Sequence, residues 1–324
     1  MSNAIQRLKK VDGGVTELPA SDGLPASVHV WSKDEILAIN AALATGKALL
    51  LRGEPGTGKT QLGRAAAVDL GRTFAYQAVD SRTETRDLLW TLDAIARLAE
   101  AQVLGTRDNV SEEERKKALE LSNYLQPGAL WWAFRPNDAR EQATKGGPGA
   151  CVSTSQDKDA NGAVALLDEI DKADPSVPNG LLDALGHGGF AVPGRQRVCV
   201  DSERPPLILL TTNEERGLSE AFLRRCLVLT LRFPEGDKLA PYLVKRGALH
   251  HPDVPESLLQ EAAAIVARDR VELAAMGLPG PGLSEYLDLV AAVAGEGLRG
   301  KARSNLLSEV GAFILRKHDR RPLR

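Results

Sequence analysis

Apolar residues fall into short runs over the first two thirds of this chain and into helical spacings over its last third. Short apolar runs indicate β-strands, and a run without polar alternation is typical of a strand buried on both faces. Helical patterns separate most of these runs, so the order of elements predicts an α/β fold with a doubly wound parallel sheet. The sheet is expected to have five strands, at 48–52, 73–79, 163–169, 206–213 and 227–231.

The same pattern divides the chain into an αβα core and a C-terminal helical domain. Residues 1–27 have no periodic pattern and contain several Gly and Pro residues, which predicts a flexible N-terminal segment. The core is expected over 28–234, where Phe233 and Pro234 mark a boundary. Residues 235–324 are expected to be α-helical, with amphipathic helices at 238–247, 256–276, 284–297 and 302–317.

Two stretches inside the core depart from a simple alternation of strands and helices. Residues 84–125 are charged and helical in pattern, which predicts a helical insert. Residues 136–162 are rich in Gly, Asp, Lys, Gln and Ser, which predicts a long loop with a functional role. Between them, Trp131 and Trp132 are expected in a core or interface rather than in a stacking platform. A hairpin that turns near Gly194 is expected over 188–200.

The most specific motif directly follows the first strand and opens a helix. It matches the P-loop pattern G-x-x-x-x-G-K-[ST] in the strand–loop–helix context that this motif requires. Glycines let successive backbone N–H groups wrap a phosphate, and the helix N-terminus favours an anion. A chance Gly/Pro-rich turn is the alternative, expected about once in a hundred chains of this length. The predicted nucleotide-binding residues are Gly53, Glu54, Pro55, Gly56, Thr57, Gly58, Lys59, Thr60 and Gln61.

Within this loop and at the ends of later strands, individual side chains are assigned roles in ATP hydrolysis. Lys59 is expected to reach the β- and γ-phosphates, and the Thr60 hydroxyl to ligate Mg²⁺. Asp168 is expected to hold Mg²⁺ and Glu169 to act as general base, because a parallel sheet binds ligands at the carboxyl ends of its strands. Asn213 is placed to orient water or the γ-phosphate. Taken alone, the two acids would fit a solvated turn equally well, and an Asn after a strand is usually a turn residue.

Composition narrows the class of protein. A net charge of −2 over 324 residues gives no support for a nucleic-acid or membrane-surface role. The three cysteines, Cys151, Cys199 and Cys226, are too widely spaced for a zinc site or a disulfide framework. No apolar run approaches bilayer length and no signal-peptide core is found, so a reduced, cytoplasmic protein is expected.

The order of these motifs resembles that of AAA+ ATPases. Residues 53–60 resemble Walker A, 167–169 Walker B, 212–213 sensor 1, and Arg224 with Arg225 the arginine finger. Within that class the chain resembles the MoxR family. The softer features that carry this assignment are the sequence around Asp168 to Asp174, the segment 127–130, the hairpin before sensor 1, and residues 220–226.

The resemblance implies several properties that composition does not. AAA+ modules commonly form rings of six subunits with ATP and Mg²⁺ at the interface, where Arg225, with Arg224 as a second candidate, would act on the neighbour's γ-phosphate. In MoxR proteins the insert and the hairpin are thought to contact protein clients, and a partner with a von Willebrand factor A (vWA) domain is common. Short members occur in bacterial conflict and defence gene clusters. The helical domain over 235–324 would be the lid.

One departure from the family pattern stands out. The position that usually carries a sensor 2 arginine corresponds to 278–285, which contains no basic residue. Either another cation substitutes, or the coupling between nucleotide and lid is weakened.

Three functions fit the sequence. The favoured one is an oligomeric ATPase that remodels or activates a protein partner in the manner of a chaperone. The second is an ATP-gated scaffold or signalling switch with slow hydrolysis, which the missing sensor 2 cation keeps open. The third is a DNA-acting motor, which Arg195 and Arg197 on the hairpin permit but which no aromatic and basic surface supports.

Overall fold

The computed structural model describes residues 6–21, 24–107, 109–153, 161–295 and 300–315. Contacts between residues divide the chain into two compact units. The second unit consists of residues from Leu231 onward together with the segment Gly53–Lys59, and the first unit contains the remainder.

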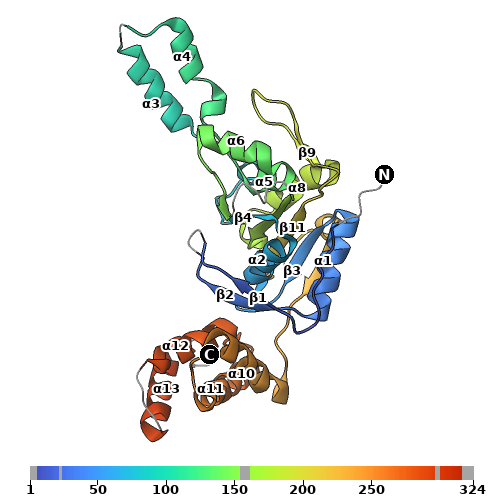
Figure 1. Cartoon of the computed structure of the whole chain (residues 1–324), viewed down its shortest axis with the longest axis vertical. Helices are drawn as coiled ribbons and strands as arrows, with labels where there is room; N and C mark the ends of the chain where they lie inside the picture. Colours follow the sequence, from blue (N-terminus) through green and yellow to red (C-terminus); the bar gives the residue numbers. More distant parts are fainter. Residues whose placement is uncertain (1–5, 22–23, 108, 154–160, 296–299, 316–324) are drawn as a thin grey trace. The chain divides into compact units, whose positions relative to one another are not determined.

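The first unit is built on a six-stranded sheet with the strand order β12-β3-β11-β8-β4-β7 (Figure 1). Strands β12, β3, β11, β8 and β4 are parallel, which confirms the five strands that the sequence predicts. The sixth strand, β7, was not predicted and pairs antiparallel with β4 at the edge. The strands are β3 (Ala48–Arg52), β4 (Thr73–Ala78), β7 (Cys151–Ser153), β8 (Ala163–Asp168), β11 (Leu207–Thr212) and β12 (Cys226–Thr230).

Helices cover both faces of this sheet. Leu50, Leu167 and Leu210 form one core with helices α5 (Ala129–Phe134) and α8 (Ser176–His187). Leu166 and Leu209, the residues before Leu167 and Leu210, face the other way and contact α2 (Lys59–Leu70). Helix α1 (Lys33–Thr45) packs against β3 and β12. Trp131 and Trp132 of α5 are at most 2% exposed, which confirms a core role. The continuous apolar runs are thus explained by burial on two sides.

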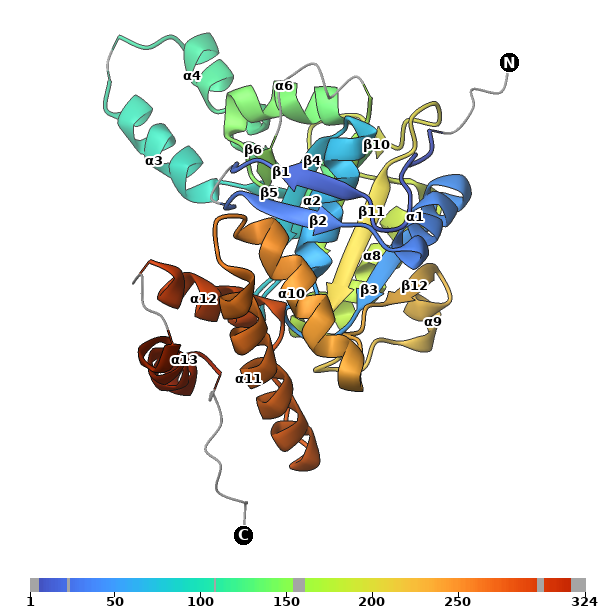
Figure 2. The same cartoon turned by 60° about the horizontal axis from the view of Figure 1, so that its bottom comes forward.

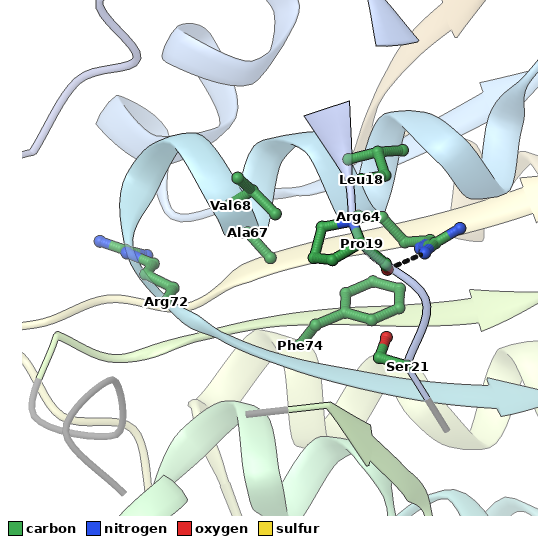
Figure 3. Close-up of a pocket in the computed structure, with 8 residues that line it drawn as sticks. All are labelled: Leu18, Pro19, Ser21, Arg64, Ala67, Val68, Arg72 and Phe74. Carbon is green, nitrogen blue, oxygen red and sulfur yellow. Dashed lines mark hydrogen bonds between the residues drawn. The ribbon is translucent and has the colours of Figure 1, made fainter. Parts of the chain in front are cut away.

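Where the structure describes it, the N-terminal segment is not the flexible lead-in that was expected over 1–27. Strand β1 (Val15–Leu18) pairs antiparallel with β2 (Ser27–Val30). Figure 3 shows Leu18 and Pro19 lying against α2, where Arg64 donates a hydrogen bond to the Pro19 carbonyl at 2.8 Å. A four-residue strand is too short to give a clear period in the sequence. Residues 1–5 and 22–23 lie outside the described residues.

The insert expected to be helical over 84–125 also contains a two-stranded antiparallel ribbon, β5 (Trp90–Leu92) with β6 (Leu125–Pro127). Helices α3 (Ala94–Gly105) and α4 (Glu112–Ala118) lie between these strands in sequence and extend away from the sheet of the first unit in Figures 1 and 2. The short 3₁₀ turn η1 (Thr85–Leu88) precedes β5, and the 3₁₀ turn η2 (Leu121–Asn123) precedes β6. Strands of three residues leave no detectable pattern, so the ribbon was missed.

The prediction of a long loop over 136–162 is wrong for the first part of this range. Residues Pro136–Gly146 form helix α6, with proline at its first position, and β7 follows. Only Pro136, Ala139 and Gln142 of this helix are buried, so it has almost no apolar stripe for a sequence reading to detect. Residues 154–160 of the expected loop lie outside the described residues.

The hairpin before β11 is confirmed, as β9 (Gly189–Phe190) pairs antiparallel with β10 (Val198–Cys199). Its arginines are bound within the chain. Arg195 donates to Asp138 at 2.5 Å and to Gln142 at 2.6 Å, and its guanidinium lies 5.0 Å from the centre of the Trp131 ring. Arg197 donates to the carbonyl of Gly189 at 2.7 Å.

Among its described residues the second unit is helical from Leu239 onward, as the sequence predicts, while the ends of the helices expected at 284–297 and 302–317 lie outside the described residues. A one-turn η4 (Gly236–Lys238) precedes its helices. The fully buried Tyr286 lies at the centre and donates a hydrogen bond to the carbonyl of Leu259. The helices are α10 (Leu239–His250), α11 (Glu256–Ala275), α12 (Leu283–Ala294) and α13 (Gly300–Ile314). Among the described residues of both units, no helix combines the length and the apolar character needed to cross a membrane.

Candidate active site

The loop between β3 and α2 has the backbone that a phosphate cradle requires. Gly53 and Gly58 have φ angles of 150° and 92°, in the region that favours glycine. A Cβ atom on Gly53 would lie 2.5 Å from the Leu231 carbonyl oxygen, so no other residue fits there. A Cβ on Gly58 would meet nothing within 4 Å, which leaves open space in front of the loop. The N-terminus of α2, at Lys59, follows at once.

The side chains of the loop are held by the loop itself. Lys59 is only 8% exposed, and its Nζ donates to the carbonyls of Gly53 at 2.6 Å and Glu54 at 3.1 Å. The Thr57 hydroxyl donates to the same Glu54 carbonyl at 2.8 Å. Gln61 lies one position beyond the motif and accepts a hydrogen bond from Arg64. The lysine ammonium is therefore already directed at the oxygen-rich inside of the loop.

Asp168 is the centre of the second group of residues, at the carboxyl end of β8. Its Oδ1 accepts from the Thr211 hydroxyl at 2.5 Å. Its Oδ2 accepts from the Thr60 hydroxyl at 3.2 Å and from the Tyr76 hydroxyl at 3.1 Å. β8 lies between β4 and β11 in the sheet, so parallel pairing brings Tyr76 and Thr211 to the same edge as Asp168. These donors fix the orientation of the carboxylate.

Tyr76 remains a hydrogen-bond donor over a wide pH range. Burial of the phenol, followed by the neighbouring Asp168 carboxylate, raises the pKa of Tyr76 to about 12. Both causes disfavour the phenolate, because it would be a second negative charge in a poorly solvated place. The hydroxyl therefore keeps its proton at every pH at which the protein would act.

Glu169 has an unusual backbone and two side-chain partners. Its φ of 61° and ψ of 49° are left-handed, and its N–H donates to the Thr211 hydroxyl at 2.8 Å. Its carboxylate accepts from Asn213 Nδ2 at 3.1 Å and from Lys172 Nζ at 2.6 Å. The hydrogen bond that the Lys172 ammonium donates to Glu169 raises the pKa of Lys172. The backbone turn thus directs the Glu169 side chain away from the path of β8 and toward the tip of β11.

The predicted residues Thr60, Asp168, Glu169 and Asn213 are thereby brought together by hydrogen bonds. Three partners were missed: Tyr76, Thr211 and Lys172. A sequence signal existed for Thr211, since it lies at the polar end of an apolar strand two residues before Asn213. Tyr76 lies mid-strand, where the sheet register pairs it with Leu166, and only its hydrogen bond shows that its side chain reaches Asp168.

Arg224 and Arg225 stand apart from this group. They follow the short helix α9 (Glu220–Leu223) and are exposed. Arg224 forms an ion pair with Glu220 at 3.5 Å, and Arg225 donates to the carbonyl of Ala221 at 3.2 Å. Within the described part of the chain, neither arginine has a hydrogen bond to Asp168, Glu169 or Asn213.

The donor set fits a magnesium–nucleotide. Mg²⁺ prefers oxygen ligands and is usually held by one or two protein groups together with phosphate oxygens and water. The Thr60 hydroxyl and the Asp168 carboxylate are oxygen donors within 3.2 Å of each other. No group of three or more His, Cys, Asp or Glu able to hold a metal occurs among the described residues, so a metal here depends on the nucleotide.

A family model and several solved structures are similar to this chain. A family model described as "AAA domain (dynein-related subfamily)" matches residues 48–226. No curated protein matched the sequence. Among solved structures, a proline-to-glycine mutant of RuvB from Thermotoga maritima is 16% identical, with 87% of this chain and 68% of that one covered and a TM-score of 0.44. A structure described as the Thermotoga maritima RuvB Holliday junction branch migration motor is 17% identical, with coverages of 86% and 67% and a TM-score of 0.41.

Proposed function

Because the chain belongs to the dynein-related subfamily of AAA domains, a family of P-loop ATPases, we propose that it assembles into a ring and uses ATP hydrolysis to remodel or activate a protein partner. One observation carries the proposal. Hydrogen bonds link Thr60 to Asp168 and Asn213 to Glu169 at the end of β8. A module that only binds nucleotide needs the phosphate loop, whereas hydrolysis also needs an oriented carboxylate base.

The chain's own residues have distinct roles in this proposal. Residues 53–60 would hold the phosphates of ATP through backbone N–H groups and the Lys59 ammonium. Thr60 and Asp168 would hold Mg²⁺, with Tyr76 and Thr211 keeping the Asp168 carboxylate in place. When bound, Mg²⁺ supplies positive charge that neutralises phosphate oxygens during transfer.

Glu169 would be the general base that takes the proton of the attacking water. Its carboxylate is oriented by Asn213 and Lys172, whose donor atoms lie at 3.1 Å and 2.6 Å. Fixed donors hold the base in one orientation, so little free energy is needed to reorganise it before the reaction. Asn213 would also contact the γ-phosphate or the water, as its place at the tip of β11 suggests.

Ring formation would complete the site. AAA+ proteins commonly assemble into rings, and a ring of six is the family's usual size. The exposed Arg225, with Arg224 as a second candidate, would reach the γ-phosphate bound by the neighbouring subunit. A positive group added there stabilises the charge that develops in the transition state.

The finer assignment to the MoxR type rests on the sequence motifs. Helices α3 and α4 support a role in client binding, since Ile95 and Leu98 on α3 are 83% and 62% exposed. A protein client, for example a partner with a vWA domain, would contact helices α3 and α4. The chain would then act as a chaperone-like ATPase of the kind found in bacterial conflict and defence systems.

The two alternatives fare differently. An ATP-gated scaffold with slow hydrolysis stays open, because turnover alone separates it from a remodelling ATPase. A DNA-acting motor loses support, because Arg195 and Arg197 of the hairpin are bound to Asp138, Gln142 and Gly189 within the chain. We therefore do not propose DNA as the substrate.

The test is steady-state ATP hydrolysis per subunit, measured across a range of protein concentrations. The specific rate is expected to rise with concentration, because each site needs an arginine from its neighbour. Glu169→Gln should retain ATP binding and lose hydrolysis by at least about a hundredfold, the usual contribution of a general base.

Two results would contradict the proposal. A specific rate that is flat and equal to that of Glu169→Gln would leave only a nucleotide-gated switch. Loss of ATP binding in Glu169→Gln would overturn its assignment as the base. Lys59→Ala, which should abolish tight ATP binding, serves as the control for contaminating ATPases.

A further inference from the structure

The phosphate loop contains an acid whose charge is opposed by a cation from the helical domain. Glu54, the second residue of the loop, accepts a hydrogen bond from Arg270 Nη2 at 2.5 Å. Arg270 lies on α11, and both residues belong to the second unit of the chain. They are 216 residues apart in sequence, so the fold alone creates this pair.

Arg270 is held in place by more than the ion pair. Its guanidinium lies 4.8 Å from the centre of the Phe233 ring, and its side chain is 18% exposed. Its Nη1 donates to the carbonyls of Gly280 and Pro281 at 3.4 and 3.2 Å. A Cβ on Gly280 would come within 2.6 Å of Arg270 Cγ, so glycine makes room for the arginine. These contacts place one charged group at a defined position beside the loop.

The segment that Arg270 contacts is the one in which the sequence lacks a basic residue. Residues 278–285 contain no Arg, Lys or His. Two backbone carbonyls of this segment nevertheless accept hydrogen bonds from the Arg270 guanidinium. The same segment lies against the loop, because a Cβ on Gly282 would lie 3.1 Å from the Pro55 carbonyl oxygen. The positive charge therefore comes from α11 and reaches the loop across this segment.

A carboxylate in a phosphate-binding loop works against the ligand. ATP has several negative charges, and a like charge nearby lowers its affinity unless an opposite charge neutralises it. A bound guanidinium provides that opposite charge through a charge-assisted hydrogen bond.

We propose that Arg270 is a positioning residue of the nucleotide site, which neutralises Glu54 and so allows the loop to accept the phosphates of ATP. The inference rests on the proposed function, because it needs ATP to bind at residues 53–60. It makes Arg270 act through Glu54, so removal of Glu54 should remove the need for Arg270.

The test is equilibrium binding of the fluorescent analogue mant-ATP with Mg²⁺ to the full chain. Arg270→Met keeps the apolar stem on Phe233 and loses the charge, and it should weaken binding by at least tenfold. Arg270→Lys keeps the charge and should stay within threefold of wild type. The double variant Glu54→Gln with Arg270→Met should also bind within threefold of wild type. Glu54→Gln alone keeps the backbone N–H groups of the loop and removes its carboxylate, so it should bind mant-ATP about twofold to fivefold more tightly than wild type.

Arg268 provides the matched control. It lies on the same helix two positions earlier, its side chain is 63% exposed, and its ion pair is with Asp269 rather than with the loop. Arg268→Met should leave mant-ATP binding unchanged. Far-ultraviolet circular dichroism of each variant checks that the helices remain folded.

The outcomes separate the inference from the proposed function. Absence of mant-ATP binding by wild type would overturn both. Wild-type binding that persists unchanged in Arg270→Met would overturn the inference alone. A double variant as weak as Arg270→Met would show that Arg270 acts on the nucleotide or on packing without Glu54, which also overturns it.

Discussion

At the scale of single residues, the candidate site depends on hydrogen bonds to one carboxylate. Asp168 accepts from Thr60, Tyr76 and Thr211, which lie on three different elements. An ionised carboxylate accepts several hydrogen bonds, and those to a charged group contribute more than neutral ones. These partners therefore determine how well Asp168, the proposed metal ligand, is oriented before a metal binds.

Replacement of Tyr76 by phenylalanine tests this orientation. Tyr76→Phe removes one donor from Asp168 Oδ2 and adds no atom, so the fold should be unchanged. We expect the Mg²⁺ concentration for half-maximal ATP hydrolysis to rise about tenfold to a hundredfold, the usual effect on metal affinity of removing a hydrogen bond that orients a metal ligand. Since the raised pKa of Tyr76, about 12, keeps the phenol protonated, the effect should be the same from pH 6.5 to pH 9.

Tyr124→Phe is the control for this change. The Tyr124 hydroxyl donates to the carbonyl of Ala118 in the insert, so its loss should not alter the Mg²⁺ dependence. An unchanged Mg²⁺ dependence in Tyr76→Phe would mean that Thr60 and Thr211 hold the carboxylate without it.

At the scale of elements, α6 shows how a helix forms with little apolar surface. Gln142 on this helix is fully buried, and its amide nitrogen donates to the carbonyls of Ser122 at 2.6 Å and Leu125 at 2.8 Å. Its amide oxygen accepts from Arg195 of the hairpin at 2.6 Å. One side chain therefore ties the helix, the insert and the hairpin together through polar contacts.

Replacement of Gln142 by leucine should destabilise the first unit. The substitution keeps a similar volume and leaves the Ser122 and Leu125 carbonyls and the Arg195 guanidinium without this partner. An unsatisfied buried polar group costs about 1–3 kcal/mol, so we expect the free energy of unfolding in urea to fall by at least that amount. Glu141→Leu, on the exposed face of the same helix, should change it by less than about 0.5 kcal/mol. Equal stabilities of the two variants would contradict the role given to Gln142.

At the scale of the whole molecule, the two arginines proposed as the finger stand apart from the proposed base Glu169. Arg224 and Arg225 are exposed after α9, with their hydrogen bonds confined to that helix. A complete site in this proposal therefore requires a second copy of the chain. Activity would then be a property of the assembly, since the neighbour's arginine would add to the stabilisation of transition-state charge.

Mixing of two inactive variants tests this idea. Arg225→Ala should bind ATP as wild type does and hydrolyse it about a thousandfold more slowly, the lower end of the range for an arginine finger. Lys59→Ala should fail to bind ATP but still offer its Arg225 to a neighbour. Mixed rings should recover part of the activity, with a maximum at an intermediate ratio. No recovery at any ratio would count against a finger that acts in trans.

The sequence by itself determined the parts of the molecule that depend on local chemistry. The phosphate loop follows from glycines at positive φ and from the lysine and threonine that open α2. The five parallel strands follow from apolar runs, because strands buried on both faces need no polar alternation. The capping box of Ser32 and Glu35 at the start of α1 is a local feature of the same kind, since both residues belong to one helical turn.

The tertiary structure alone decided the features that join distant residues. Tyr76 meets Asp168 across 92 residues and Arg270 meets Glu54 across 216, distances over which no periodic pattern extends. Helix α6 and strand β1 were missed because polar contacts and two or three buried side chains hold them, not a long apolar stripe. A sequence pattern reports which faces avoid water, whereas sheet register and the packing of the chain determine which polar groups meet.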